Sequence, residues 1–392
     1  MSEQQEQPPV QRKELVGWAM YDFANSGYTT VVLTSIFNAY FVAVVAGGAG
    51  MDSGAGTFLW TIAVAAGNAL VLLSAPIVGA IADQHAAKKR FLLITTIGCV
   101  LGTALLGLVG PGNLVPGMLL LIISLMMFGS GEYLIAAFLP EIASDDEMGR
   151  VSGYGWGLGY FGGLLTLGLC LGWITWAQGQ DQPATAYVPV TLWITAGIFA
   201  CAALPTFLLL NERAVPTTDS TKRLPVAAGF SRVRTTLSHA RTYQDLFRFL
   251  VTLVVFQAGM STVIVVAAIY AQEVLTFERD ELIFIIMVVN LTAAVGAFGM
   301  GHLQDRIGSS RSLALALGIL IVAIVLVFLA EERSDIWLPA NLIGLAMGAT
   351  QSAGRALIGQ FTPVARTGEF FGLWGLAMHL ATIIGPLTYG AI

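Results

Sequence analysis

Three ionisable residues, Asp22, Glu132 and Arg355, lie inside stretches that otherwise have the composition of membrane-spanning helices. A charge at the centre of a bilayer costs roughly 2.5 to 3.5 kcal/mol on insertion scales, so such residues usually mark a substrate or ion pathway. Two carboxylates facing one guanidinium can bind both ends of a zwitterion. Arg355 would take a carboxylate bidentately, while Asp22 or Glu132 would take an ammonium. The alternative is a static salt bridge that closes one end of the pathway.

Glu132 has a second candidate role. A carboxylate whose charge is costly in an apolar cavity can bind and release a proton during each transport cycle. The sequence therefore leaves three roles open at this position: a substrate contact, a proton carrier, or part of a closing salt bridge.

A polar stripe accompanies Asp22 on the first hydrophobic stretch. Asp22, Asn25, Ser26 and Thr29 are spaced i, i+3, i+4 and i+7, which puts them on one helix face. In lipid such a face should turn toward the bundle interior or a water-filled cavity. Alternatively, Asp22 lies close enough to the start of the helix to sit at the membrane surface.

Other polar and aromatic residues are secondary candidates. His379 shares a helix face with Gly372 and Gly375. Its imidazole could titrate near physiological pH, or it could simply hydrogen-bond a neighbouring helix. Trp156 and Tyr160 either line a cavity or are ordinary interfacial or core aromatic residues. Position alone suggests substrate contacts at Gln257, Ser261 and Thr262.

The composition identifies the elements that must position these groups. Of 392 residues, 56% are hydrophobic and 11% charged, and the mean hydropathy of +0.76 is far above that of a soluble domain. The chain is therefore an integral membrane protein, and nothing supports nucleic-acid binding.

Residues 1–14 lack the apolar stretch of a cleavable signal, so the first hydrophobic segment should remain as an anchor. Cys99, Cys170 and Cys201 have no paired spacing, which argues against disulfides and a zinc site.

Eleven stretches are long and apolar enough to cross a membrane as helices, which requires about 20 residues each. They cover residues 17–45, 58–82, 91–110, 114–139, 151–174, 187–210, 247–270, 281–300, 312–329, 337–360 and 369–392. We therefore expect an all-α membrane protein.

The basic residues predict its orientation. With the N-terminus in the cytoplasm, one side of the membrane receives Arg12, Lys13, Lys88, Lys89, Arg90, Arg150, Arg213, Lys222, Arg223, Arg232, Arg234, Arg241, Arg248, Arg306, Arg311 and Arg366. The opposite side receives only Arg279 and Arg333. This bias follows the positive-inside rule and predicts a multi-pass protein of the cell (inner) membrane with a cytoplasmic N-terminus.

A cytoplasmic linker divides the predicted helices into two groups. Residues 1–210 hold six helices, residues 211–246 form the linker, and residues 247–392 hold five. Within the linker, Phe230, Val233 and Leu237 follow helical spacing. They lie beside the basic residues Arg232, Arg234 and Arg241. Either an amphipathic helix on the inner leaflet or a flexible basic linker fits this pattern.

The two groups repeat one another. Gly79 and Asp83 precede a basic loop, and so do Gly301 and Asp305; the offset between the aspartates is 305 − 83 = 222. The prolines that end two later helices, Pro140 and Pro363, are offset by 223. Two unrelated features at one offset indicate a duplicated unit. Glu132 and Arg355 each precede their proline by eight residues, so they are equivalent positions.

Two six-helix bundles joined by a linker are the plan of a major facilitator transporter. Against that plan the chain is one helix short, and we expect the twelfth to be missing through a C-terminal truncation; a natural eleven-helix protein is the alternative. In this plan the first, fourth, seventh and tenth helices line a central cavity. Asp22, Glu132 and Arg355 would then lie at similar depth in its cytoplasmic half.

The loop that begins at Gly79 resembles the signature cytoplasmic loop of the major facilitator superfamily. Glycine allows close helix contact, and the aspartate can sit at the positive N-terminus of a helix from the other half. A solvated aspartate in an ordinary turn is the alternative. The first copy departs from the common pattern at Ala86 and Ala87. A conformational gate would then comprise Gly79, Asp83, Arg90, Gly301, Asp305 and Arg306.

The first helix carries a more specific resemblance. GWAMYDFANSGYTT at residues 17–30 resembles the opening signature of the vacuole-effluxer-like major facilitators, whose fungal members are associated with amino-acid efflux during autophagy. AFLPEI at residues 137–142, SGYGWGLGYFGG at 152–163, and Gln351 with Arg355 are also similar. The resemblance implies family membership and does not by itself assign a substrate; an amino acid or a similar zwitterion is expected from the charges of Asp22, Glu132 and Arg355. The chain differs from the family pattern just before Gly259. It has Gln257 and Ala258 there, whereas an acidic residue is often found at this place in the family. Any ion coupling must then rest on other groups.

Six glycines lie between Gly153 and Gly163, with spacings of four at Gly153 with Gly157 and at Gly155 with Gly159. Small residues four apart let membrane helices approach closely. We expect this helix to pack tightly against a neighbour, across the interface that moves.

Three other function classes compete with a transporter. An enzyme is disfavoured because no H-E-x-x-H motif, no G-x-S-x-G motif and no cluster of histidines or cysteines occurs. A channel fits the two-fold repeat poorly, and a non-transporting sensor on the same scaffold stays open. We expect a secondary transporter that moves a small polar solute by alternating access. It should work as a monomer and without a cofactor, and it can be coupled to a proton or not. A multidrug-type efflux transporter is the alternative.

Overall fold

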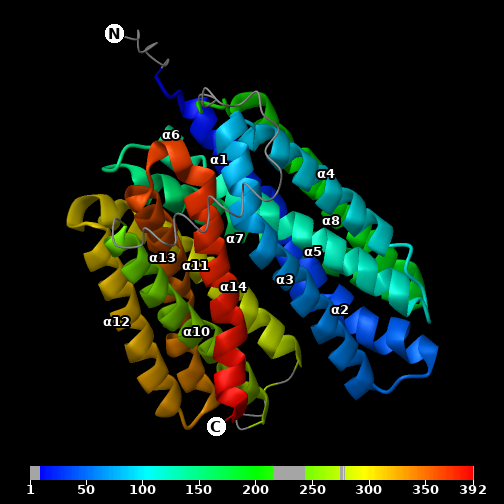
Figure 1. Ribbon diagram of the computed structural model, residues 1–392. Coiled ribbons are helices and arrows are strands. Elements are labelled where there is room, and N and C mark those ends of the chain that lie inside the picture. Colours follow the sequence, from blue (N-terminus) through cyan, green and yellow to red (C-terminus); the bar gives the residue numbers. More distant parts are fainter. Residues whose placement is uncertain (1–8, 215–242, 274–276, 278, 392) are drawn as a thin grey trace, which may run out of the picture.

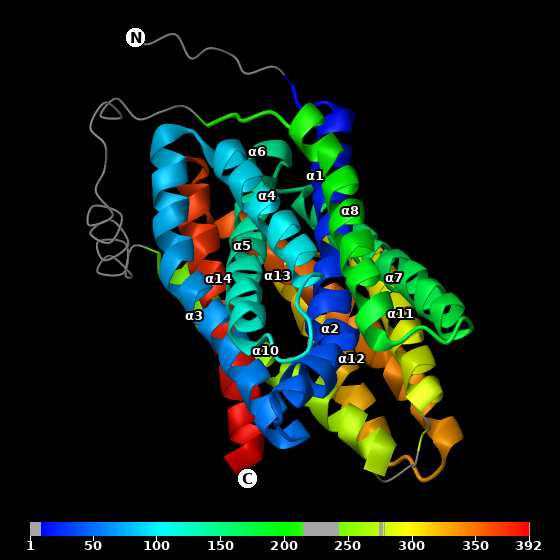
Figure 2. The same ribbon diagram turned by 90° about the vertical axis from the view of Figure 1, so that its right-hand side faces the viewer.

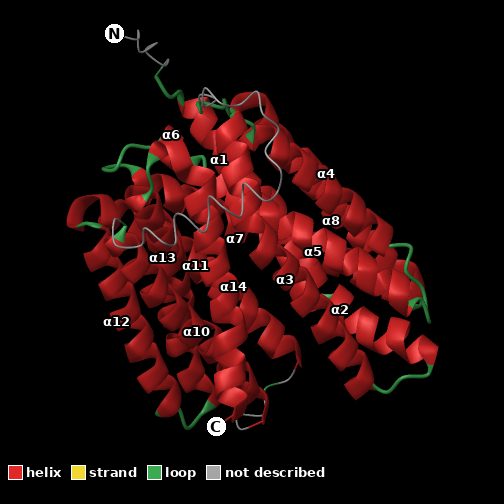
Figure 3. Cartoon of the chain, in the orientation of Figure 1, coloured by secondary structure: helices red, strands yellow, loops and turns green. Residues whose placement is uncertain are grey.

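The computed structural model describes the chain except for residues 1–8, 215–242, 274–276, 278 and 392 (Figure 1). The described part is helical and contains no strand (Figure 3). The predicted amphipathic stretch of the linker, from Phe230 to Arg241, lies outside the described residues.

The first span is irregular. Helix α1 (Arg12–Gly27) continues as a π-helical segment, Tyr28–Ser35, then as α2 (Phe37–Tyr40), a second π-helical segment, Phe41–Ala46, and a short 3-10 turn, Gly47–Ala49. The other helices of the first half are α3 (Ser53–His85), α4 (Lys88–Leu106), α5 (Leu114–Ala136), α6 (Leu139–Ile142), α7 (Met148–Gln178) and α8 (Ala184–Leu209). Because lipid offers no hydrogen bonds, these apolar segments must pair their own backbone groups, which a helix does.

Five long helices follow the linker. They are α10 (Gln244–Glu273), α11 (Arg279–Ile307), α12 (Ser309–Phe328), α13 (Trp337–Phe361) and α14 (Thr367–Ala391). Each of the eleven predicted spans falls on one long helix or helical run. In the described residues, ten helices are long and apolar enough to cross a membrane; α13, which carries Arg355, is not among them. The all-helical membrane fold is therefore confirmed.

Helices α3 and α7 of the first group lie against α14 and α11 of the second (Figure 2). Glycines make these contacts close: Gly153 lies against the carbonyl of Ala297, and Gly372 against Pro76. The two groups converge at the end of the molecule where the N-terminus lies and diverge toward the other end (Figure 1). We call the converging end the basic face, because α1 begins there and the basic loops after α3 and α11 lie there.

Candidate functional site

A buried ion pair joins the two groups of helices. Arg355 of α13 donates from Nη1 to Oδ2 of Asp22 on α1 at 2.6 Å. Its Nε donates to Oγ of Ser152 on α7 at 3.2 Å, and its Nη2 donates to the Ser152 carbonyl at 2.8 Å. The rings of Trp18 and Trp156 lie 4.6 and 5.2 Å from the guanidinium carbon. Every guanidinium nitrogen therefore already donates, and with Asp22 8% and Arg355 3% exposed, neither residue sits at the protein surface.

The glycine-rich helix α7 makes room for this pair. A Cβ on Gly155 would overlap Oδ2 of Asp22 and Nη2 of Arg355. One turn later, a Cβ on Gly159 would lie 2.9 Å from Oγ of Ser26. Because the pair passes directly over the backbone of α7, any side chain at position 155 would separate its members.

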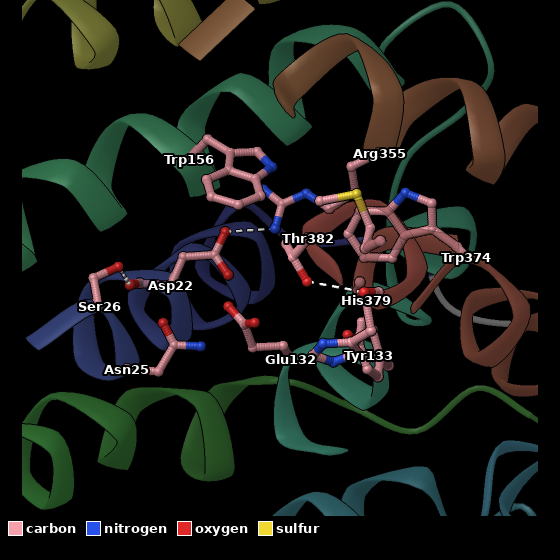
Figure 4. A pocket seen from close by; sticks show the side chains of 12 residues that line it. Asp22, Asn25, Ser26, Glu132, Tyr133, Trp156, Arg355, Trp374, His379 and Thr382 are labelled. Carbon is pink, nitrogen blue, oxygen red and sulfur yellow. Dashed lines mark hydrogen bonds and ion pairs between the residues drawn. The ribbon is translucent and has the colours of Figure 1, made fainter. Parts of the chain in front are cut away.

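A cavity lies beside the ion pair and between the two groups of helices (Figure 4). Its volume is about 170 Å³, and it opens partly to the outside. Its lining residues are Asp22, Asn25, Ser26, Glu132, Tyr133, Ala136, Trp156, Arg355, Trp374, Met378, His379 and Thr382. The three charged residues singled out by the sequence thus line one cavity, together with three of the secondary candidates, Asn25, Trp156 and His379.

Several polar groups of this cavity have no protein partner within the described part of the chain. Glu132 is half-buried and makes no hydrogen bond or ion pair there. Three buried nitrogens, Nε1 of Trp156, Nε1 of Trp374 and Nε2 of His379, also lack a hydrogen-bond partner. Since buried polar groups in native proteins are nearly always paired, the three nitrogens call for an occupant of the cavity, either water or a solute, and Glu132 faces the same space.

The remaining candidates lie elsewhere. Tyr160 donates a hydrogen bond to Gln351, which joins α7 to α13 outside the lining of this cavity. Gln257 is buried on α10 but does not line the cavity. Thr262 donates to the carbonyl of Ala258 within its own helix, where α14 approaches closely. Among the described side chains, α14 rather than α10 forms most of the second group's contribution to the cavity wall.

The two repeated aspartates sit at helix N-termini. Asp83, at the end of α3, accepts from the backbone nitrogens of Gly368 and Glu369 at 2.9 and 3.0 Å, where α14 begins. Asp305, at the end of α11, accepts from the backbone nitrogen of Arg150 at 3.3 Å, where α7 begins. Each carboxylate faces the positive end of a helix from the other group, so the two contacts are equivalent by the sequence repeat.

The other predicted gate residues differ in their surroundings. Gly79 lies against the backbone of Gly368, and Gly301 against that of Gly149. Arg90 and Arg306 are exposed and make no hydrogen bond or ion pair with described residues.

Lys88 is the basic residue of the first loop that reaches the other group, and sequence reasoning missed it. It is fully buried, pairs with Glu141, and donates to Oγ1 of Thr367 at 2.6 Å. No sequence signal distinguishes it from Lys89 and Arg90 beside it.

Comparisons with known proteins identify the family. The family model described as "Vacuole effluxer Atg22 like" matches residues 10–392. The chain belongs to this family. The resemblance of its first helix and glycine-rich segment to vacuole effluxers is thereby confirmed.

Relatives of this Atg22-like protein include an MFS-type transporter, an autophagy-related protein and an efflux pump. An uncharacterized MFS-type transporter, YxiO of Bacillus subtilis, is 26% identical over 96% of this chain and 87% of its own length. Autophagy-related protein 22-1 of Neosartorya fischeri is 24% identical over 62% of this chain and 43% of its own length. The multi-drug resistance efflux pump PmrA of Streptococcus pneumoniae is 23% identical over 88% of this chain and 81% of its own length.

Solved structures show the same fold. The human organic anion transporter MFSD10 matches with a TM-score of 0.75 at 16% identity, covering 97% of this chain and 93% of that one. The transporter FucP in its outward conformation matches with a TM-score of 0.72 at 14% identity, covering 97% of this chain and 91% of that one. The Atg22-like chain is thus a multi-pass membrane transporter of the major facilitator kind and not an enzyme.

Proposed function

We propose that this protein is a secondary transporter of a small zwitterion, such as an amino acid, and that the cavity beside Asp22 and Arg355 is its binding site. The observation that carries the proposal is the unpaired carboxylate of Glu132 in a cavity between the two groups of helices. A solute that fills the cavity would remove this half-buried carboxylate from water, which is costly unless the solute brings a partner; an ammonium group would be that partner.

The charges of the cavity favour a ligand with a cationic end. Asp22 and Arg355 neutralise each other at 2.6 Å. Glu132 then remains as the cavity's one uncompensated charged group among the described lining residues. An amino acid supplies an ammonium for Glu132, together with a carboxylate that needs hydrogen-bond donors.

The basic face supports an alternating-access cycle. The Asp22–Arg355 pair, the Asp83 and Asp305 contacts and the Lys88–Thr367 hydrogen bond all join the two groups on this side. With the N-terminus cytoplasmic, as the distribution of basic residues favours, this conformation is closed toward the cytoplasm. Transport by a monomer in the cell membrane would then require these contacts to separate together. Residues 1–210 and 247–392 would act as the two moving bundles.

Multidrug-type efflux is the second candidate function. Aromatic and thioether side chains, from Tyr133, Trp156, Trp374 and Met378, make up much of the cavity wall, and such surfaces bind varied amphiphiles. The similarity to the efflux pump PmrA points in the same direction.

A thermal-shift screen of the purified protein separates these functions. The probes are the proteinogenic amino acids and a matched set of amphiphilic organic cations. We expect stabilisation by one or more amino acids, and a smaller stabilisation of Glu132→Gln at the same concentration because its binding is weakened. The control Glu331→Gln, which changes an exposed side chain outside the cavity, should leave the stabilisation intact. Stabilisation by amphiphiles alone would replace the zwitterion proposal with the efflux function.

A further inference from the structure

Helix α14 lines the cavity with four side chains, from Trp374, Met378, His379 and Thr382. Among the residues that the structure describes, Arg355 is the other lining residue that the second group of helices contributes. The chemistry available to a solute on that side therefore depends mainly on α14, unless Arg355 is free to bind it.

Arg355 is not free in this conformation. Its Nη1, Nη2 and Nε donate to Asp22 and Ser152, and it is 3% exposed. The rings of Trp18 and Trp156 lie close to its guanidinium group. A solute carboxylate could reach it bidentately only by displacing Asp22, so the negative end of a solute needs other donors.

Two nitrogens of α14 meet that need. Nε1 of Trp374 and Nε2 of His379 are buried without a hydrogen-bond partner, and Trp374 is 5% exposed. An indole N–H can only donate, and an imidazole donates from the nitrogen that carries its proton. Trp374 therefore requires an acceptor, and His379 can supply a second donor.

Both side chains pack on the residue that follows Glu132. The ring centroids of Trp374 and His379 lie 5.9 and 5.7 Å from that of Tyr133, both edge to face. Figure 4 shows Trp374, His379, Tyr133 and Glu132 around the same cavity. Donors on α14 and an acceptor on α5 thus line one cavity, and both donor side chains pack on the tyrosine that follows the acceptor in the sequence.

We propose that Trp374 and His379 form the subsite for the carboxylate of the solute, while Glu132 receives its ammonium. This assignment rests on the proposed zwitterion transport. It makes α14 the helix that distinguishes an amino acid from the corresponding amine, because the amine lacks the acceptor that Trp374 needs.

The test compares binding of an amino acid with binding of the amine that lacks its carboxylate. The probes are those amino acids that stabilise the wild-type protein and their decarboxylated amines, with dissociation constants measured by calorimetry. Trp374→Phe should weaken amino-acid binding by about tenfold or more, since a hydrogen bond to a charged group is lost. Binding of the amine should stay within about twofold of wild type. His379→Phe should act in the same direction, and Glu132→Gln should weaken both ligands.

Trp176→Phe is the matched control, because Trp176 lies on α7 with 54% of its surface exposed. Equal weakening of both ligands by Trp374→Phe and His379→Phe, or no weakening by either, would overturn the carboxylate subsite while leaving amino-acid transport in place. If no amino acid stabilises the wild-type protein, the proposed function itself fails. Should Trp374→Phe not fold, His379→Phe alone carries the comparison.

Discussion

The contact between Gly155 and the Asp22–Arg355 pair is the most sterically restricted feature of the site. A methyl group at position 155 would occupy the space of both charged groups. We predict that Gly155→Ala separates the pair and leaves two poorly compensated buried charges, which are costly by several kcal/mol. The midpoint of thermal unfolding should fall by more than about 4 °C.

Gly168→Ala provides the control for that substitution. Gly168 lies on the same helix, and a Cβ there would meet nothing within 4 Å. Its unfolding midpoint should match the wild-type value. If Gly155→Ala also leaves the midpoint of thermal unfolding unchanged, the ion pair is not held against α7 as described.

Glu132 is the residue at which proton coupling can be tested. It lines the cavity without a protein partner among the described residues, so proton binding would not have to break an ion pair. We predict that Glu132→Gln abolishes accumulation driven by a pH gradient in proteoliposomes. Counterflow exchange of the same amino acid should persist when it is measured at concentrations high enough to saturate the weaker binding of the variant. Accumulation that survives the substitution would assign coupling to another group. Loss of both activities would indicate a substrate contact alone.

At the scale of helices, the charge of Asp83 stabilises the contact between α3 and the start of α14. A carboxylate at a helix N-terminus contributes about 0.3 to 1 kcal/mol at the surface and up to about 2 kcal/mol when partly buried. We predict that Asp83→Asn shifts the population toward conformations in which the basic face is open. Spin labels at Arg90→Cys and Ala365→Cys, both exposed, report this shift in electron–electron double resonance as a larger share of long distances.

Asp305→Asn should produce the same shift, because Asp305 makes the equivalent contact with α7. Asp245→Asn is the control, since Asp245 is paired on the surface with Arg248 at 3.5 Å and its side chain is 77% exposed. An unchanged distance distribution in both aspartate variants would argue against a gate at these helix ends.

The helices themselves were predictable from the sequence. Runs of about 20 largely apolar residues form helices in lipid, and the sequence located all eleven, although α13 does not meet the length and apolarity that the other ten meet. The offset of 222 between Asp83 and Asp305 also identified two equivalent positions, which the structure places at the starts of α14 and α7. The π-helical segments of the first span were not predicted, because they depend on how that helix packs against its neighbours.

The partners within the site were less predictable. Spacing assigns a residue to a helix face, but helix rotation and side-chain conformation decide which groups meet. Arg355 therefore pairs with Asp22 rather than with its repeat equivalent Glu132. For the same reason, the sequence did not indicate that Lys88, rather than Arg90, would reach Thr367. It also favoured α10 over α14 as a wall of the cavity.

At the scale of the whole molecule, the described contacts between the two groups gather near the basic face, so a link across that face should hold the transporter in one state. Gln360 of α13 donates to the carbonyl of Asp145, in the loop before α7, at 3.0 Å. In a protein whose native cysteines are replaced, Gln360→Cys and Asp145→Cys can be joined by a short bifunctional thiol reagent. Counterflow of the amino acid found by thermal shift should then be lost. A third cysteine, Thr382→Cys in the cavity wall, should react with a membrane-impermeant reagent only from the side opposite the basic face.

A link within one group controls for damage by the reagent. The Lys89 backbone nitrogen donates to Oε2 of Glu212 at 2.8 Å, which ties the start of α4 to the segment directly after α8, within the first half of the chain. Joining Lys89→Cys to Glu212→Cys should leave counterflow unchanged, because no relative movement of the two groups is blocked. If the Gln360–Asp145 link also leaves counterflow intact, the two groups do not separate at the basic face during transport. The buried pair of Asp22 and Arg355 would then be a permanent structural contact, since it lies on the same side and could not open either.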